Sequence, residues 1–168
     1  MIEFQPLRKD DLPLLRDWLE RPHVREWWRD SLDESIAEYE QAMAGLDPSD
    51  HYLIVRDGRP IGMIETYLVS DHPDWEAIVQ VGEGFAGVDL LIGEEELTGR
   101  GLGPRILDAF VNRVVFANPA IHGAVAAVDE ANRRSWRAFE KAGFRHVRDV
   151  EEEGRPHRLM RLDRRYAP

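Results

Sequence analysis

Gly99-Arg100-Gly101-Leu102-Gly103-Pro104-Arg105 is the stretch of this 168-residue chain that decides the fold, and it leads into an amphipathic helix predicted over residues 105–117. Glycine lets the backbone approach a ligand with its N–H groups, and the start of the following helix adds a positive dipole end. Arg100 and Arg105 supply guanidinium donors for phosphate oxygens, whereas Pro104 has no N–H. The pattern fits a phosphate-binding turn, and it fits equally well a glycine-rich loop that only starts a helix.

Hydrophobic periodicity predicts the elements on either side of this stretch. On the carboxyl side we expect a strand at 124–128, a helix at 133–142 that Gly143 ends, and strands at 144–150 and 157–162. On the amino side we expect a strand at 2–7 and a helix from residue 12 that Arg21-Pro22 breaks. A helix at 33–44, capped by Asp33, should follow. We then expect a hairpin of 52–56 and 60–69, a loop at 70–86, and a strand at 88–92. This order predicts an α/β (α+β) domain with a mixed sheet and helices packed on it.

Composition excludes several classes of protein. The net charge of −10 argues against a nucleic-acid partner, because such binding depends on neutralising phosphates. The chain has no Cys, and its six His residues show no metal-binding spacing, so we expect no metal. The amino-terminal residues lack an apolar segment, and no apolar run is long enough to cross a membrane. We therefore expect a cytoplasmic protein without a membrane partner.

Charge is distributed unevenly along the chain. Residues 1–97 carry 23 acids and 8 bases, whereas residues 98–168 carry 9 acids and 14 bases. An acidic half beside a basic half suits a cationic substrate and an anionic cofactor, although surface charge also drifts along chains without functional meaning.

Two segments together resemble the acetyl-coenzyme-A signature of the GNAT superfamily of N-acetyltransferases. They are the glycine-rich turn and the run Asn132-Arg133-Arg134-Ser135-Trp136-Arg137-Ala138-Phe139-Glu140-Lys141-Ala142-Gly143-Phe144. Further segments are similar to those of aminoglycoside 6′-N-acetyltransferases: Glu26-Trp27-Trp28, Asp57-Gly58-Arg59-Pro60-Ile61-Gly62 and Gly87-Val88-Asp89. The resemblance implies one GNAT domain over residues 1–168, with a mixed, mostly antiparallel sheet of six to seven strands flanked by helices.

The resemblance also implies where acetyl-CoA binds. Backbone N–H groups of the turn would hold its pyrophosphate, and the strand before the turn would pair with its pantetheine arm. The residues concerned are Arg100, Gly101, Leu102, Gly103 and Arg105 for the pyrophosphate, and Leu91 and Ile92 for the pantetheine. Asn132 would contact the cofactor with Ser135 on the same helical turn, although Asn132 also suits a plain helix N-cap.

Acidic and aromatic residues are the candidates for binding an amine. Asp89 matches an acid of the aminoglycoside enzymes, and a carboxylate there can take the proton of an attacking amine. Its alternative reading is a residue that ends a strand. We expect Asp74 and Glu76 to bind cationic amino groups. Three tryptophans can stack on sugar rings, or equally well serve the core or a helix surface instead: Trp27, Trp28 and Trp75.

One departure concerns the leaving group. Many relatives have a Tyr before Glu-Lys-Ala-Gly-Phe, and its hydroxyl can protonate the departing thiolate. This chain has Phe139 there, so Tyr67 or water would serve as the proton donor, or CoA leaves as a thiolate.

Together with the resemblance, the sequence predicts acetyl transfer to an aminoglycoside 6′-amine in a ternary complex, by a monomer or a homodimer. The alternatives are another small amine (a siderophore precursor or polyamine), a protein N-terminus, or a non-catalytic acyl-CoA-binding module.

Overall fold

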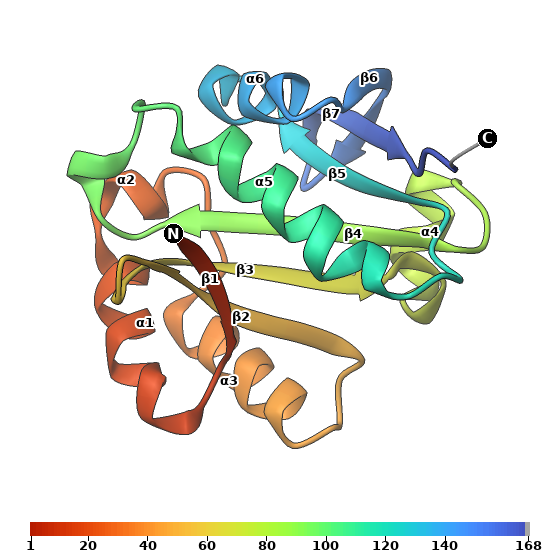
Figure 1. Ribbon diagram of the computed structural model, residues 1–168. Coiled ribbons are helices and arrows are strands. Elements are labelled where there is room, and N and C mark those ends of the chain that lie inside the picture. Colours follow the sequence, from red (N-terminus) through yellow and green to blue (C-terminus); the bar gives the residue numbers. More distant parts are fainter. Residues whose placement is uncertain (167–168) are drawn as a thin grey trace. The chain divides into compact units, whose positions relative to one another are not determined.

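The structure of the protein is a computed structural model that describes residues 1–166, so the last two positions of the predicted domain lie outside it. Its strands are β1 (Ile2–Pro6), β2 (Ser49–Arg56), β3 (Arg59–Leu68), β4 (Phe85–Ile92), β5 (Gly123–Asp129), β6 (Arg145–Glu152) and β7 (Arg155–Asp163). Its α-helices are α1 (Leu12–Glu20), α2 (Pro22–Arg25), α3 (Leu32–Met43), α4 (Pro73–Val79), α5 (Leu102–Arg113) and α6 (Arg133–Lys141). Figure 1 shows this order along the chain.

The chain divides into two compact units. The first contains Met1–Thr66 and Asp89–Thr98, and the second contains Tyr67–Val88 and the residues from Gly99 onward. Strand β4 runs from the second unit into the first. The seven strands are hydrogen-bonded in the order β1-β2-β3-β4-β5-β7-β6. Because β4 and β5 are parallel while β1–β2, β5–β7 and β6–β7 are antiparallel, the expected mixed, mostly antiparallel sheet is confirmed.

In the first unit, α1 and α3 bury their apolar sides in one core cluster. The cluster's buried members are Leu7, Leu12, Leu15, Trp18, Leu19, Val24, Ile36, Tyr39, Leu53, Val55, Met63 and Leu91. The expected break at Arg21-Pro22 is confirmed, since α1 ends at Glu20 and α2 begins at Pro22. The cap predicted for α3 was wrong. Ser31 accepts from the Glu34 N–H, Glu34 reaches back to the Ser31 N–H, and Asp33 lies in the first turn.

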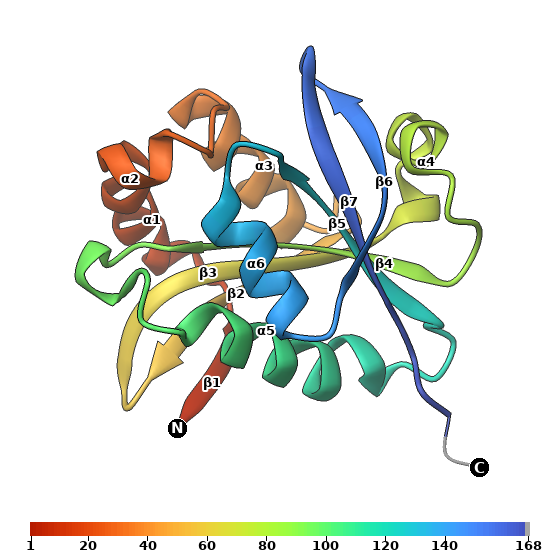
Figure 2. The same ribbon diagram turned by 90° about the horizontal axis from the view of Figure 1, so that it is seen from above.

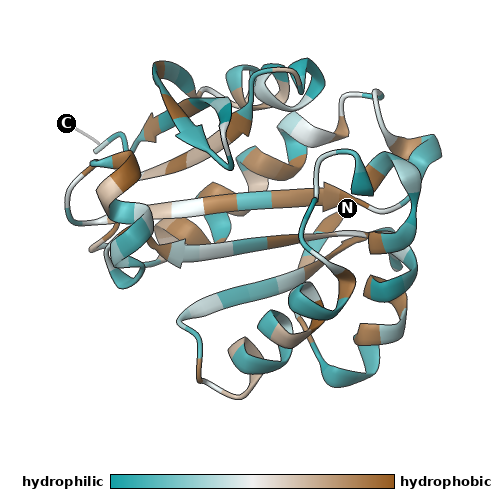
Figure 3. Cartoon of the chain, turned by 180° about the vertical axis from the view of Figure 1, so that it is seen from behind, coloured by the Kyte–Doolittle hydropathy of each residue, from teal (hydrophilic) through white to brown (hydrophobic). Residues whose placement is uncertain are grey.

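In the second unit, α5 carries the apolar stripe that its sequence predicts. Leu102, Ile106, Leu107, Phe110 and Val111 are buried, and the helix begins three residues earlier than expected. Figure 3 shows apolar and polar colours alternating along the helices in this way. Figure 2 shows β6 beside β7, and the register pairs Glu152 with Arg155 next to their tight turn.

The loop predicted at residues 70–86 was wrong. A short 3-10 helix (Val69–Asp71) and α4 occupy much of this segment, and β4 begins at Phe85. Pro73 stands at the first position of α4, where the missing N–H costs nothing. Trp75 and Val79 then pack on an apolar cluster that includes Val69 and Phe85, and this packing stabilises a helix of only seven residues.

None of the helices between residues 1 and 166 has the length and apolar content needed to cross a bilayer.

Candidate active site

The glycine-rich turn of the second unit has the geometry of a ligand cradle. Gly99 and Gly101 both adopt positive φ, +69° and +75°, a region that L side chains rarely occupy. A Cβ added at Gly101 would meet nothing within 4 Å. Gly101 is the N-cap residue of α5 and has no side chain with which to cap this helix. The N–H groups of the first turn thus gain no acceptor from the N-cap position, an arrangement that suits a bound anion.

Arginines stand around this turn. Arg100 and Arg105 are exposed, as donors for phosphate oxygens need to be. The guanidinium carbon of Arg134, on α6, would lie 3.6 Å from a Cβ added at Gly99. Arg134 was not among the residues predicted from the sequence, although the basic run after Asn132 was a usable signal. The turn thus has positive charge on both α5 and α6.

Asn132 serves as the N-cap of α6. Its Oδ1 accepts a hydrogen bond from the Ser135 N–H at 3.3 Å, so the capping interpretation is confirmed. Its predicted contact with a cofactor stays a prediction, as does that of Ser135.

Phe139 is an apolar core residue. It is 2% exposed, and its ring meets the edge of Phe144 at a centroid distance of 5.0 Å. Tyr67, the alternative proton donor, packs its ring over Gly87 and against the His72 ring at 4.9 Å.

The three candidates on α4 differ in their surroundings. Asp74 is exposed and Glu76 is half-buried. Trp75 is half-buried and packs against the apolar cluster of the second unit, which agrees with the core interpretation. The binding roles predicted for these residues stay predictions.

In the first unit, the carboxyl end of β4 is held by several side chains. The Gly93 N–H donates to the Ile61 carbonyl at 2.9 Å, and Arg21 donates to the Gly93 carbonyl at 2.8 Å. His23 Nε2 lies 3.0 Å from the Ile92 carbonyl, and because a carbonyl only accepts, Nε2 carries the hydrogen. Leu91 is buried in the core cluster. The pantetheine pairing predicted for Leu91 and Ile92 stays a prediction.

Glu94 fixes this end of β4 to α1. Its carboxylate accepts from Trp18 Nε1 and from Arg21, both at 3.1 Å, and pairs with Arg59 at 3.4 Å. Burial alone would raise the pKa of Glu94, but the hydrogen bonds from Trp18 and Arg21 and the nearby guanidinium charges hold it below its ordinary value.

Asp89 lies opposite Glu65 in the sheet. Strands β3 and β4 run in opposite directions (Figure 1), and the Gly93 N–H donates to the Ile61 carbonyl. Counting four residues along each strand from this pair brings Glu65 opposite Asp89. Side chains at facing positions of antiparallel strands are close neighbours, with Cβ atoms about 5 Å apart.

Both carboxylates are on the sheet face that α1 and α3 cover. Met63 and Leu91 belong to the core cluster on this face. Because side chains alternate between the two faces of a sheet, Glu65 and Asp89 share the face of these two residues. Asp89 is half-buried, and its side chain makes further interactions within the structure.

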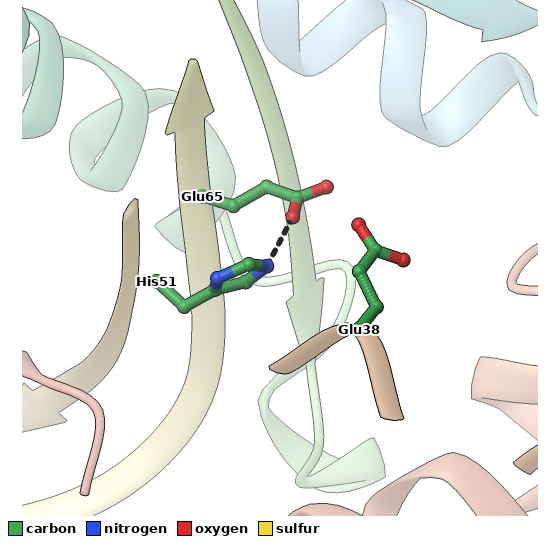
Figure 4. Close-up of side chains that lie close together, drawn as sticks. All are labelled: Glu38, His51 and Glu65. Carbon is green, nitrogen blue, oxygen red and sulfur yellow. Dashed lines mark ion pairs between the residues drawn. The ribbon is translucent and has the colours of Figure 1, made fainter. Parts of the chain in front are cut away.

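A buried ion pair adjoins this position (Figure 4). His51 on β2 lies with its Nε2 2.6 Å from Glu65 Oε2, and Glu38 on α3 turns its carboxylate toward the pair. One ligand-type atom of each of the three residues lies within 4.8 Å of the others. We call Glu38, His51 and Glu65 the acidic cluster. This cluster was not predicted from the sequence, although Glu65 is the one acid in a mostly apolar predicted strand.

The two tryptophans after α2 lie in different surroundings. Trp28 packs against the core cluster of the first unit, and it approaches the Tyr39 hydroxyl without hydrogen-bond geometry. Trp27 lies under the Arg29 guanidinium at 5.7 Å. The core interpretation of Trp28 is thus confirmed in part, and the stacking role predicted for both tryptophans stays a prediction.

The structure therefore groups the predicted site residues within each unit. In the first unit Asp89 joins the neighbourhood of the acidic cluster, on the sheet face against which Trp28 packs. In the second unit Arg100–Arg105 lie at the start of α5, with Arg134 of α6 beside the turn.

Comparison with known proteins agrees with this geometry. A family model described as an acetyltransferase (GNAT) domain matches residues 8–152. The aminoglycoside N(6′)-acetyltransferase type 1 of Klebsiella pneumoniae is 29% identical over 145 residues, covering 82% of this chain and 71% of the relative. A crystal structure of the aminoglycoside acetyltransferase AAC(6′)-Ib with coenzyme A superposes with a TM-score of 0.87 at 27% identity, covering 98% of this chain and 95% of that one. The same enzyme with coenzyme A and kanamycin gives a TM-score of 0.87 at 28% identity, over the same shares of the two chains.

Proposed function

We propose that this chain, which belongs to the GNAT acetyltransferase family, transfers an acetyl group from acetyl-CoA to the 6′-amine of an aminoglycoside. The choice of acceptor rests on one observation. The chain is similar, over 98% of its length, to an enzyme crystallised with coenzyme A and kanamycin. The carboxylates of the first unit support the choice, because they suit a polycationic acceptor. We treat residues 1–168 as one functional domain.

The second unit binds the cofactor in this proposal. The start of α5, whose N-cap residue is a glycine, presents N–H groups to the diphosphate, and Arg100, Arg105 and Arg134 add charge. Open space at Gly101 lets the diphosphate approach the backbone. The bound cofactor supplies an acetyl thioester, whose carbonyl carbon is the electrophile.

The first unit prepares the acceptor. An amine attacks only when neutral, and an alkylamine has a pKa near 10.4 in water. Asp89 orients the amine and takes its proton directly or through one water molecule. The N–C bond forms and the C–S bond breaks, so the acetyl group passes to nitrogen within a ternary complex.

CoA leaves as a thiolate and takes its proton from solvent. Phe139 cannot donate one, and it is packed against Phe144. A thiol pKa near 8.5 makes the thiolate a tolerable leaving group close to neutral pH.

The proposal is tested by mixing the protein with acetyl-CoA and kanamycin or tobramycin and following the release of free thiol. We expect turnover well above the hydrolysis of acetyl-CoA alone, and a product acetylated at the 6′-nitrogen. A panel of polyamines, amino acids and N-terminal peptides separates this acceptor from the others. If no 6′-amino aminoglycoside is turned over while another amine is, the acceptor assignment fails and the acetyltransferase assignment stands.

A further inference from the structure

The acidic cluster is buried at one end and open at the other. The His51 side chain is 2% exposed and the Glu65 side chain 12% exposed. Glu38 belongs to the exposed part of α3 and points its carboxylate at the pair (Figure 4). A group from solvent can therefore reach the cluster past Glu38. The resemblance assigned no role to any of these three residues.

The charges of the cluster do not balance. Burial lowers the pKa of His51, but the hydrogen bond and charge of Glu65 outweigh it and hold the pKa above its ordinary value. A protonated His51 ring offsets one of the two carboxylates. Burial and the charge of Glu65 raise the pKa of Glu38 to about 7, although the charge of His51 acts to lower it. With two carboxylates and one imidazole, the fully ionised cluster is one positive charge short of neutrality.

A buried hydroxyl adjoins the two carboxylates. Tyr39 is 2% exposed, its ring meets the His51 ring edge-on at 4.9 Å, and within residues 1–166 its hydroxyl has no partner with hydrogen-bond geometry. Burial first, and then the charges of Glu65 and Glu38, raise its pKa, so the hydroxyl faces these carboxylates as a neutral group. A buried polar atom without a partner costs about 1–3 kcal/mol, which a donor group from a ligand removes.

This combination fits an ammonium group better than a metal ion. An ammonium has one positive charge and three donors, which match the missing charge and the oxygens of Glu38, Glu65 and Tyr39. A metal ion needs an imidazole nitrogen without a proton as its ligand, whereas His51 Nε2 lies 2.6 Å from Glu65 Oε2, a distance that fits an N–H donated to this carboxylate.

The cluster also lies next to the position assigned to the reacting amine. Glu65 faces Asp89 across β3 and β4, on the face that α3 covers. We propose that Glu38, Glu65 and the Tyr39 hydroxyl, with His51 holding Glu65 in place, bind a second ammonium group of the acceptor. This inference rests on the proposed function and narrows it. The acceptor carries a second amine close to the first, and an acceptor with a carboxylate in that place is rejected.

Direct binding tests this proposal without requiring turnover. Calorimetry in the presence of CoA compares kanamycin with 6-amino-6-deoxyglucose, which has one primary amine and no second one. We expect Glu38→Gln and Glu65→Gln each to weaken kanamycin binding about 10- to 100-fold, the size of a hydrogen bond to a charged group, and to change binding of the monoamine less than twofold. Glu40→Gln, an exposed acid on the same helix, is the matched control and leaves both affinities unchanged.

Other outcomes overturn the proposal. If both ligands lose affinity equally in the variants, the cluster has a structural role. If kanamycin affinity is unchanged in both variants, the cluster has no role in binding the acceptor. If Glu65→Gln fails to fold, Glu38→Gln alone tests the proposal, because Glu38 lies on the exposed part of α3 and its substitution should leave the fold intact. Stoichiometric binding of Zn²⁺ that Glu65→Gln abolishes and kanamycin does not displace makes the cluster a metal site. If kanamycin binds through the cluster but is never acetylated, the proposed function fails and this inference stands.

Discussion

The indole ring of Trp18 occupies the space in which a side chain at Gly93 would have to stand. Trp18 is fully buried, and a Cβ added at Gly93 would overlap three atoms of its ring. The same indole donates through Nε1 to Glu94 at 3.1 Å. Position 93 therefore requires glycine for steric reasons, and α1 is tied to the end of β4 by both contacts.

We accordingly expect Gly93→Ala to destabilise the protein by about 3 kcal/mol or more, because overpacking a rigid aromatic site forces the backbone to move. Unfolding in urea at neutral pH measures this free energy. Gly45→Ala is the control, since Gly45 has positive φ but open space around it. A loss at Gly93 no larger than the loss at Gly45 would contradict the steric explanation.

Glu94 should make the stability of the first unit depend on pH. Because the pKa of Glu94 is lowered in the folded state, its contribution is present above the ordinary carboxyl value of 4.5 and is lost as pH falls through the lowered pKa. We expect Glu94→Gln to lower the free energy of unfolding by about 1–3 kcal/mol at pH 7. The difference in this free energy between the variant and the parent protein should disappear in acid. Glu96→Gln, at an exposed neighbour, should cost little at either pH. Urea unfolding at pH 7 and at several values from about pH 5 down to about pH 3 measures how both differences change.

The elements that carry the longest apolar stripes were predictable from sequence. The α5 stripe and the Asn132 cap of α6 depend on local spacing, and both are present in the structure. Helix α4 was not predictable in this way, because its seven residues gain their stability from packing on residues far along the chain.

One part of the candidate site was predictable from the sequence and the other was not. The glycine-rich turn is contiguous in the chain, so its residue types were sufficient to predict it. The acidic cluster is not, because Glu38, His51 and Glu65 come from a helix and two strands and meet only after β2 and β3 pair. Sequence spacing among histidines could not reveal a site in which one histidine is paired with a carboxylate. The sequence signal that remained was Glu65, the one charged residue inside a mostly apolar predicted strand.

Gly101 should affect binding of the cofactor. We expect Gly101→Ala to raise the Kd for CoA about tenfold, because φ of +75° costs an L residue about 1–2 kcal/mol and an added methyl group fills the space at the turn. Calorimetry with CoA measures the change. Gly58→Ala, at a turn with φ of +79° in the first unit, is the control for a simple loss of stability and should leave CoA binding unchanged.

Asp89 should affect transfer and spare cofactor binding. A general base contributes about 100- to 10,000-fold to a rate, so we expect Asp89→Asn to lower kcat/KM for kanamycin within this range. The Kd for CoA should stay within twofold of the parent value. Asp33→Asn, with a side chain 94% exposed, is the control. Unchanged kinetics for Asp89→Asn would remove Asp89 from the reaction.

The acidic cluster should make acceptor binding depend on pH near neutrality. Glu38 faces Glu65, His51, Asp47 and Asp30, and burial together with the acids raises its pKa to about 7. Below this value Glu38 gains a proton and no longer offers a charge to an ammonium group, so kanamycin binding should weaken about tenfold between pH 8 and pH 6. Calorimetry in buffers of different ionisation enthalpy should also show a proton released on binding at pH 6.5. Glu38→Gln should lose both the proton release and this part of the pH dependence. A pH profile identical in the parent protein and the variant would show that Glu38 does not contact the ligand.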